Sequence, residues 1–295
     1  MQKIRKLLVI GAVSLIAGCA TAPANYIAAD APFAAPLVRV AAPRPVIGLV
    51  LGAGGSRGFA HVGVLKAFEA AGIEADVIVG VSSGAVVAAL HAGGMRAAAL
   101  EAAALAIEDN DLLDFTLFGP GYIEGERLQD YINDTLRGRP IEALQKPFAV
   151  VAAERTTSRM MIFTRGNTGV AVRASASVPK LFWPVKIQGT EYVDGGVASR
   201  VPASVARDMG ADIVIAVDVS WRGSVDAQKA DIVIRPDTVR TRITDFSQKI
   251  ANLAAGEEAA REVVPQVRAL LARVAAEKLR KQPETTVAIS RRNVN

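Results

Sequence analysis

Cysteine and histidine are scarce in this chain of 295 residues, which holds one cysteine and two histidines. A single cysteine, Cys19, cannot form an intramolecular disulfide, and two histidines are too few for a histidine-rich metal site. Charge of one sign is also lacking, because 34 basic residues stand against 29 acidic ones. Because the positive and negative charges are nearly balanced, the composition gives no support to nucleic-acid binding. Any chemistry must rest on Ser, Asp, Glu, Lys, Arg or backbone groups, and the sequence calls for no metal and no cofactor.

The N-terminus lacks an apolar run long enough to span a membrane. Leu7 to Gly18 is apolar and small but shorter than the roughly 20 residues that a spanning helix needs. Lys3, Arg5 and Lys6 precede it, which is the layout of a secretory signal peptide. The run ends in Ile16-Ala17-Gly18-Cys19, which resembles the bacterial lipobox, in which the signal is cut before a cysteine whose thiol carries a diacylglycerol.

The sequence therefore predicts a signal peptide over residues 1–18 and lipidation at Cys19, with an uncleaved membrane anchor as the alternative. Several acyl chains at one terminus hold a domain at a membrane, where a single chain binds only marginally. Ala20 stands where inner-membrane retention signals often have Asp, so we expect a bacterial cell-envelope protein anchored in the outer membrane and facing the periplasm.

Residues 19–45 comprise the cysteine predicted to be lipidated and an Ala/Pro-rich segment. This segment has prolines at positions 23, 32, 36, 43 and 45. Proline at this density opposes both helix propagation and sheet pairing, so we expect an extended, semi-rigid tether. The whole sequence is 51% hydrophobic, which is enough to bury a sizeable core. We divide the chain after residue 45 into a main domain, 46–236, and a C-terminal helical extension, 237–295.

Short apolar runs alternate with segments of helical spacing through most of the main domain. The strand-like runs are 46–51, 77–79, 148–153, 160–164, 185–187 and 213–219. The helix-like segments are 59–68, 85–91, 96–107, 126–136 and 201–209. Alternation of this kind predicts an α/β fold with a mainly parallel sheet covered by helices. Past Thr244 an apolar stripe predicts a further helix, kinked at Pro265, that packs on the core.

One pentapeptide has the pattern of a nucleophile elbow. Gly80-Val81-Ser82-Ser83-Gly84 is a G-x-S-x-G sequence between a predicted strand and a predicted helix. Gly80 and Gly84 are needed because such a sharp turn brings neighbouring backbone close. The alternative is a plain strand-to-helix turn with a serine cap, a role that Ser83 could fill.

The positions of the histidines exclude an ordinary Ser-acid-His triad of the α/β-hydrolase order, because no histidine follows His91. A nucleophilic Ser82 would need a carboxylate or lysine as its base. His61 and His91 both fall in predicted helices, where we expect buried or capping roles.

A glycine-rich loop, Gly52-Ala53-Gly54-Gly55-Ser56-Arg57-Gly58, precedes the first predicted helix and offers backbone N–H groups to an anion. A dinucleotide site is one interpretation, but the G-x-G-x-x-G pattern is not matched in either register. An oxyanion hole is the other, and the elbow on the next strand favours it. A third feature, Tyr192-Val193-Asp194-Gly195-Gly196, places a carboxylate before two glycines, although Asp-Gly alone is a common turn. Asp218 is a rival carboxylate.

These features, in this order, resemble the patatin-like phospholipase family. The family blocks are the glycine loop within 49–65, the elbow at 80–84, the segment 173–179 and the segment 192–196. Each piece is weak alone, but their joint occurrence over roughly residues 46–220 is specific. One departure is Ala53, where the family usually has glycine.

The resemblance implies a three-layer patatin-like fold and a Ser-Asp dyad, with Ser82 as nucleophile and Asp194 as base. It implies an oxyanion hole made by the backbone of Gly54, Gly55 and Ser56. The motif glycines are Gly52, Gly58, Gly80, Gly84, Gly195 and Gly196. Arg57 lies beside this loop, where it could stabilise an anion, attract a phosphate head group, or form a salt bridge with a nearby carboxylate.

The function implied is a serine acyl hydrolase that cleaves phospholipid or lysophospholipid esters through an acyl-enzyme, with membrane lipid as substrate and the bilayer as partner. Two alternatives remain open. One is a non-catalytic lipid-binding or scaffolding lipoprotein with the same fold, and the other is an acyltransferase that uses the same dyad.

Overall fold

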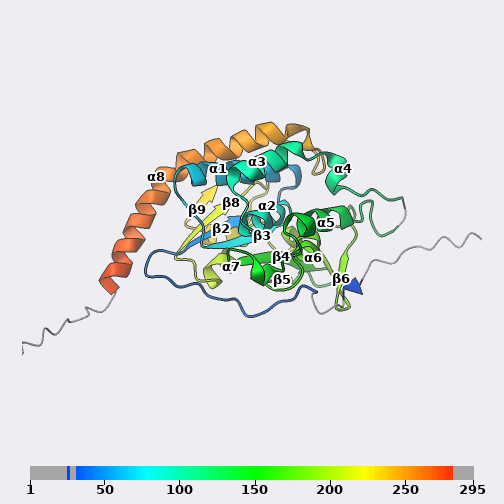
Figure 1. Cartoon of the computed structure of the whole chain (residues 1–295), viewed down its shortest axis with the longest axis horizontal. Helices are drawn as coiled ribbons and strands as arrows, with labels where there is room; N and C mark the ends of the chain where they lie inside the picture. The colour runs from blue at the N-terminus through cyan, green and yellow to red at the C-terminus, as the bar shows by residue number, and fades with distance from the viewer. Residues whose placement is uncertain (1–24, 27–30, 118, 282–295) are drawn as a thin grey trace, which may run out of the picture.

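The computed structural model describes residues 25–26, 31–117 and 119–281. Within them a single sheet runs in the order β1-β6-β7-β4-β3-β2-β8-β9, with β5 paired to β4 (Figure 1). The strands are β1 (Asn25–Tyr26), β2 (Ile47–Leu51), β3 (Val77–Val81), β4 (Phe148–Glu154), β5 (Met160–Phe163), β6 (Val185–Ile187), β7 (Thr190–Asp194), β8 (Ile213–Val217) and β9 (Ile232–Ile234). The helices are α1 (Phe59–Ala70), α2 (Ser83–Ala92), α3 (Ala97–Ala106), α4 (Asp109–Leu112), α5 (Glu126–Thr135), α6 (Thr168–Ala176), α7 (Ala203–Asp208) and α8 (Lys249–Lys281).

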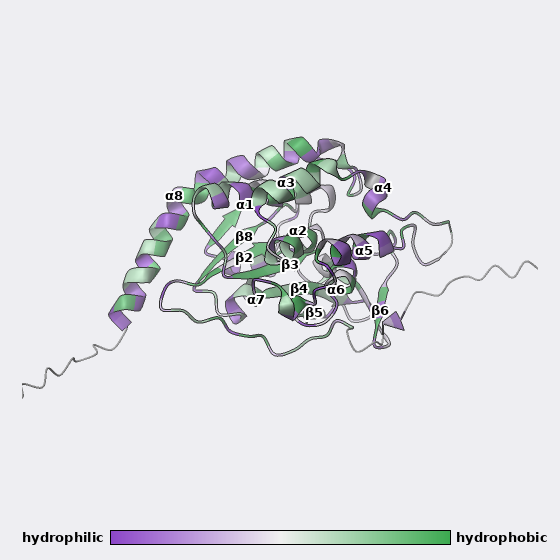
Figure 2. Ribbon diagram, in the orientation of Figure 1, coloured by the Kyte–Doolittle hydropathy of each residue, from purple (hydrophilic) through white to green (hydrophobic). Residues whose placement is uncertain are grey.

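The central strands are parallel and buried on both faces. β2, β3 and β8 have sequences IGLVL, VIVGV and IVIAV, and every residue in them is buried. Strands covered by helices on both faces read as continuous apolar runs rather than alternating ones. Figure 2 shows these strands in green at the centre of the molecule, whereas α4, α5 and α8 carry much of the hydrophilic surface. The predicted mainly parallel sheet is therefore confirmed.

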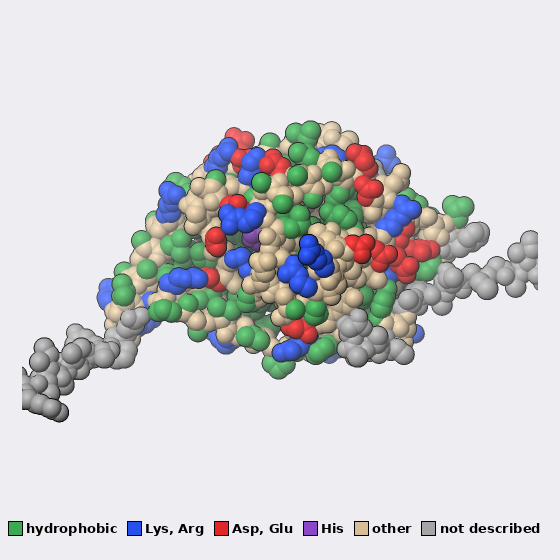
Figure 3. Space-filling model, in the orientation of Figure 1, with side chains coloured by type: hydrophobic (Ala, Val, Ile, Leu, Met, Phe, Trp, Pro, Cys, Tyr) green, Lys and Arg blue, Asp and Glu red, His purple; other side chains and the backbone are tan. Residues whose placement is uncertain are grey.

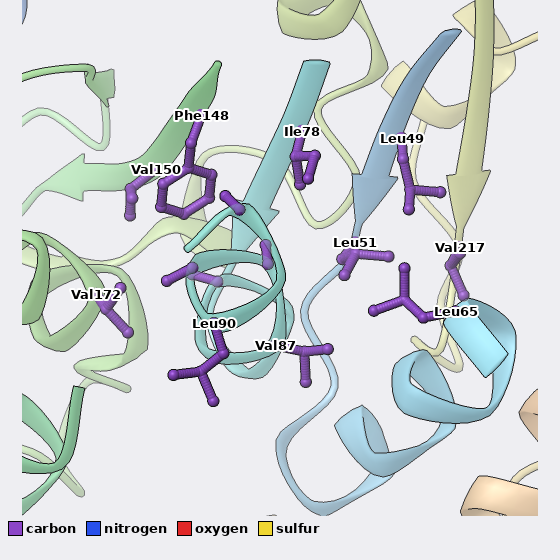
Figure 4. Close-up of a cluster of buried hydrophobic side chains, with 14 of the residues drawn as sticks. Leu49, Leu51, Leu65, Ile78, Val87, Leu90, Phe148, Val150, Val172 and Val217 are labelled. Atoms are coloured by element: carbon purple, nitrogen blue, oxygen red, sulfur yellow. The ribbon is translucent and has the colours of Figure 1, made fainter. Parts of the chain in front are cut away.

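Two separate hydrophobic cores lie on the two faces of the sheet. On one face the side chains of β2, β3, β4 and β8 pack against α1, α2, α6 and α8. Figure 4 shows part of this core, where Leu65 of α1 and Val87 and Leu90 of α2 lie against strand residues. On the other face α7 packs against the alternate strand residues, together with Leu37 and Val40. Helix, sheet and helix form the three-layer α/β fold expected from the sequence.

Helix α8 falls within the predicted C-terminal extension, 237–295, and it packs mainly on α1. Pro265 lies inside it, and Figure 1 shows the helix changing direction part-way along. Proline removes one backbone hydrogen bond and its ring crowds the preceding turn, which accounts for such a bend. None of the described helices is long and apolar enough to cross a bilayer.

The described part of the predicted tether lies against the domain. β1 pairs in parallel with β6, Phe33 bridges to Arg165, and the Val40 N–H donates to the Met209 carbonyl oxygen. Residues 31–45 contain no helix and only that single bridge, as their prolines predict. The predicted signal peptide and Cys19 lie outside the described residues.

Candidate active site

Ser82 occupies a sharp turn between β3 and α2. Its backbone has φ 55° and ψ −128°, a conformation that residues with a side chain rarely adopt. A Cβ on Gly80 would lie 2.5 Å from the Ala85 Cα, and one on Gly84 would lie 2.1 Å from the Leu51 carbonyl oxygen. Both glycines are therefore required by close backbone approach, and the strand-turn-helix geometry is the one that the pentapeptide predicts.

The Ser82 hydroxyl donates a hydrogen bond of 2.5 Å to Oδ2 of Asp194. Asp194 ends β7, is only 6% exposed, and its Oδ1 accepts a second bond of 2.7 Å from the Gly196 N–H. The sheet order brings the two residues together, since β4 pairs with β3 on one side and β7 on the other. Gly195 permits this approach, because a Cβ there would lie 2.1 Å from the Val151 carbonyl oxygen.

The carboxyl group of Asp194 is held in an environment that favours its neutral form. Burial raises its pKa from 3.8 to about 6, against the opposing hydrogen bonds from Ser82 and Gly196 and the charge of Arg200. A raised pKa makes the carboxylate a stronger base while leaving it ionised at neutral pH.

The glycine loop runs from β2 to α1 and packs against the elbow. In the described chain neither the Gly54 nor the Gly55 N–H has a hydrogen-bond acceptor. Ser56 departs from the prediction, because its N–H donates to the Ile243 carbonyl oxygen at 2.8 Å and is not available to an oxyanion. A Cβ on Gly58 would lie 2.6 Å from the Ser83 Cβ, so glycine at this position lets the loop and the elbow meet.

Two serines that the sequence analysis did not assign to the site support the elbow. Ser83 is the first residue of α2, so its N–H has no acceptor within the helix and is the donor expected next to a nucleophile at an elbow. The Oγ of Ser175 accepts from the Ser82 N–H at 2.8 Å and donates to the Val151 carbonyl oxygen at 2.6 Å. The role of Ser83 could be predicted from its position next to the nucleophile in the motif. Ser175 is separated from Ser82 by 93 residues, so no local sequence pattern indicates its role.

An apolar pocket opens beside Ser82. The glycine loop and the elbow contribute Gly55, Gly58, Ser82 and Ser83 to its wall. The rest of the lining is almost entirely apolar and comes from α2, α3, α5 and neighbouring segments, including Val86, Leu90, Leu100, Leu128, Phe182 and Phe246. A pocket of this composition suits a hydrocarbon chain.

The sequence model of the patatin-like phospholipase family matches residues 49–207, more than half of the chain. The chain belongs to this family. An uncharacterized NTE family protein of Mycobacterium tuberculosis is 32% identical over 190 residues, covering 63% of this chain and 52% of that protein. The mouse patatin-like phospholipase domain-containing protein 7 is 36% identical over 188 residues, covering 61% of this chain and 14% of that protein. The chain thus spans about half the length of the first of these relatives.

A solved structure shares the patatin-like fold. VipD from Legionella pneumophila superposes with a TM-score of 0.57 at 13% sequence identity, covering 77% of this chain and 67% of VipD. At this identity the similarity shows the fold alone.

Arg57 belongs to the patatin-like glycine loop but does not line the pocket. Its guanidinium stacks on the Trp221 ring at 3.9 Å, and Arg240 lies over the same ring at 4.3 Å. Burial, followed by the charge of Arg240, lowers the pKa of Arg57, while the charge of Asp218 opposes this. Among the described residues Arg57 forms no ion pair, so the salt-bridge alternative finds no support.

The rival carboxylate Asp218 is separate from the elbow. It follows β8, and its Oδ1 accepts from the Ser220 N–H and hydroxyl. Its Oδ2 faces Arg235 at 3.8 Å. Asp194, not Asp218, is therefore the carboxylate that contacts Ser82.

The two histidines have the structural roles expected of them. His61 is fully buried, and its Nε2 donates to the Gly52 carbonyl oxygen at 2.8 Å, which holds the start of the glycine loop. Burial lowers the pKa of His61 to about 4, so the ring is neutral around pH 7. His91 contacts the Met95 carbonyl oxygen at 3.2 Å near the end of α2. Neither ring contacts Ser82.

Proposed function

We propose that this protein is a serine acyl hydrolase that cleaves carboxylic esters of phospholipids or lysophospholipids, with Ser82 as nucleophile and Asp194 as base. The observation that carries the proposal is the 2.5 Å hydrogen bond from the Ser82 hydroxyl to Asp194 at the edge of an apolar pocket. A nucleophile in contact with a base is the arrangement that covalent catalysis requires.

In the first step Asp194 takes the Ser82 proton as Oγ attacks the ester carbonyl carbon. The carbonyl oxygen becomes an oxyanion, which the N–H groups of Gly54, Gly55 and Ser83 stabilise. Donors that are already oriented cost no reorganisation during the reaction. Collapse of the tetrahedral intermediate breaks the ester bond, and the proton on Asp194 passes to the departing alcohol.

In the second step the acyl-enzyme is hydrolysed. Asp194, again ionised, takes a proton from a water molecule, which attacks the acyl carbon. The intermediate expels Ser82 Oγ, which takes back the proton held by Asp194, and the fatty acid leaves. The acyl chain lies in the apolar pocket in both steps, because its lining offers a hydrocarbon almost no unsatisfied polar group.

We also propose that Cys19 is lipidated and holds the protein at the outer membrane, facing the periplasm. The support is the basic start, the apolar run and the Ile16-Ala17-Gly18-Cys19 site. Two or more acyl chains at this terminus would keep the domain at the lipid surface.

Two measurements test the proposed chemistry. A fluorophosphonate probe should label wild-type protein at Ser82, because only an activated serine reacts. Incubation with a mixed lipid extract, followed by mass spectrometry, should show loss of phospholipid or lysophospholipid with release of fatty acid. Absence of both signals would favour a non-catalytic lipid-binding protein. Transfer of the acyl group to another acceptor, without fatty acid release, would favour an acyltransferase.

A further inference from the structure

A short hairpin between α4 and α5 carries exposed apolar side chains. In the described residues 115–117 and 119–123, Phe115 bridges to Ile123 and the Thr116 N–H donates to the Tyr122 carbonyl oxygen at 2.8 Å. Phe115 is 62% exposed, Leu117 92% and Tyr122 66%. Single exposed apolar residues are ordinary on a protein surface, but three large ones on one projecting hairpin indicate a contact site.

The base of this hairpin forms one wall of the apolar pocket. Leu113 and Ile123 pack with Phe182 in a small buried cluster. Leu113 and Phe182 also line the pocket that contains Ser82. The base of the hairpin therefore packs directly on residues that line the pocket.

The N-terminal segment reaches the domain at the same end of the molecule. The Tyr26 hydroxyl of β1 donates to Gln129 of α5 at 2.8 Å and accepts from Arg173 at 2.9 Å. The same guanidinium donates to the Glu124 carbonyl oxygen at 2.7 Å, directly after the hairpin. Figure 1 shows β1 and the segment between α4 and α5 on the same side of the molecule.

The length of chain before β1 limits where a lipid anchor can lie. Cys19 precedes Asn25 by six positions. Six residues span at most about 20 Å when fully extended. A lipid on Cys19 therefore holds the bilayer surface within about 20 Å of β1, beside the hairpin. This step rests on the proposed lipidation, and the use of the pocket rests on the proposed function.

The charge around the hairpin indicates which kind of lipid surface it suits. Asp114 caps the start of α5, accepting from the Gly125 and Glu126 N–H groups, and Glu126 is half-exposed. Figure 3 shows acidic side chains gathered toward this end of the described surface. Negative charge here opposes binding to anionic lipid, so insertion depends on the apolar side chains and suits a zwitterionic surface.

We propose that the hairpin inserts Phe115, Leu117 and Tyr122 into the bilayer that carries the N-terminal lipid, and that lipid acyl chains pass from this surface into the pocket. The sharpest probe is Leu117, which is highly exposed and does not line the pocket. The matched control is Val225, which is 83% exposed and lies between β8 and β9, at the opposite end of the sheet from β1.

The first experiment measures insertion without any catalysis. The full-length chain carries Leu117→Cys or Val225→Cys, is labelled with an NBD fluorophore, and is reconstituted into phosphatidylcholine vesicles. The unsubstituted chain, labelled identically, serves as the blank for any reaction at Cys19. We expect a blue shift and quenching by spin-labelled lipid at position 117 only. No quenching there, or equal quenching at both positions, would overturn the proposal. A blue shift at position 117 that also occurs without vesicles would show self-association of the protein and would overturn it too.

The second experiment compares Leu117→Glu with Val225→Glu in the full-length chain. Leu117→Glu should lower hydrolysis of vesicle phospholipid at least about tenfold, since a charge replaces an apolar side chain that inserts into the bilayer, and adding anionic lipid should not restore it. Hydrolysis of a monomeric short-chain ester should stay within about twofold of wild type for both variants. Equal vesicle rates for the two variants would contradict the docking proposal. A wild-type protein that cleaves neither substrate would refute the proposed function, while the fluorescence result would still decide the docking.

Discussion

Ser82 and Asp194 each occupy a place that the fold maintains at a cost. Ser82 has a positive φ, and a backbone of this kind costs on the order of 1–3 kcal/mol. Asp194 carries its charge in a buried position, where solvation by water is lost. Features of this kind cluster at active sites because neighbouring structure enforces them. Their joint occurrence at one hydrogen bond is the strongest physical sign that this pair is functional.

The raised pKa of Asp194 predicts a specific pH dependence of activity. Because the base must be ionised, kcat/KM should fall about tenfold per pH unit below the pKa of about 6. Histidine is not the source, since burial lowers the pKa of His61 to about 4 and that of His91 below its ordinary value. The test is a pH-rate profile of the wild type and of the His61→Gln and His91→Gln variants. The fall in kcat/KM below pH about 6 should persist in both variants. Its disappearance in either folded variant would contradict an aspartate base.

The same shift predicts that Asp194 destabilises the fold at neutral pH. Its folded-state pKa of about 6 lies above the ordinary 3.8, so the folded protein binds this proton more tightly than the unfolded chain. The stabilisation that comes from the protonated Asp194 carboxyl is complete below pH about 4 and is lost as pH rises through about 6. Asp194→Asn should therefore raise the free energy of unfolding by about 1–3 kcal/mol at neutral pH, measured by urea denaturation. A variant less stable than wild type would show that the charge is compensated in the fold.

Local patterns predicted the central residues of the site because glycine spacing reports backbone contact. The glycines around Ser82 and after Asp194 are needed where backbone segments approach closely, and the order of these motifs, through the family resemblance, pointed to both positions. Ser56 and Ser175 could not be predicted in the same way. The Ser56 N–H is bound by Ile243, and the Ser175 hydroxyl reaches the elbow from α6, and both contacts depend on packing between distant segments.

At the scale of elements, strands with an apolar run were predicted, including the short β5 and β6, whereas β1, β7 and β9 were not. β2, β3, β4 and β8 have the continuous apolar sequences of buried parallel strands. β7 contains Thr190, Glu191 and Asp194, and β1 has two residues in a proline-rich segment, so neither has a local strand signal. Their pairing with β4 and β6 comes from tertiary contacts.

The crossing of α1 and α8 depends on two glycines. A Cβ on Gly256 would lie 1.9 Å from the Ala60 carbonyl oxygen, and one on Gly63 would lie 2.0 Å from the Leu253 carbonyl oxygen. On an uncrowded helix, Gly→Ala stabilises by about 0.5–1 kcal/mol. Here Gly256→Ala should instead destabilise by about 1–3 kcal/mol, because the helices must separate. Thermal unfolding of this variant beside Ala254→Leu, on the exposed face of α8, tests the claim. A Gly256→Ala protein more stable than wild type would contradict the close crossing.

At the scale of the whole molecule, the sheet order assembles the site from segments far apart in the chain. The nucleophile follows β3, the base ends β7, and β4 lies between these strands. The sequence supplied the class of fold and the order of its motifs, but it did not show that residues 31–45 lie against the domain. Those contacts are made by an irregular segment whose partners, such as Arg165 and Met209, are distant in sequence.

The anchoring of the molecule is tested by changing one residue. Cys19→Ala removes the thiol that would carry the lipid, so the protein should be lost from the outer-membrane fraction. Cell fractionation with mass spectrometry of the mature N-terminus measures this. Ser14→Ala, within the same apolar run, is the control and should leave the distribution unchanged. Recovery of a wild-type N-terminus other than lipidated Cys19 would contradict the proposal.

The central claim is that Ser82 and Asp194 act as one unit in ester cleavage. Its most direct test is the rate of ester hydrolysis by Ser82→Ala, Asp194→Asn and the double variant, each shown to be folded. Each single substitution should lower kcat by about a thousandfold or more, and the double variant should be no slower than the slower single one. Near wild-type activity in Asp194→Asn, or a double variant slower by the product of the two single effects, would contradict the pairing.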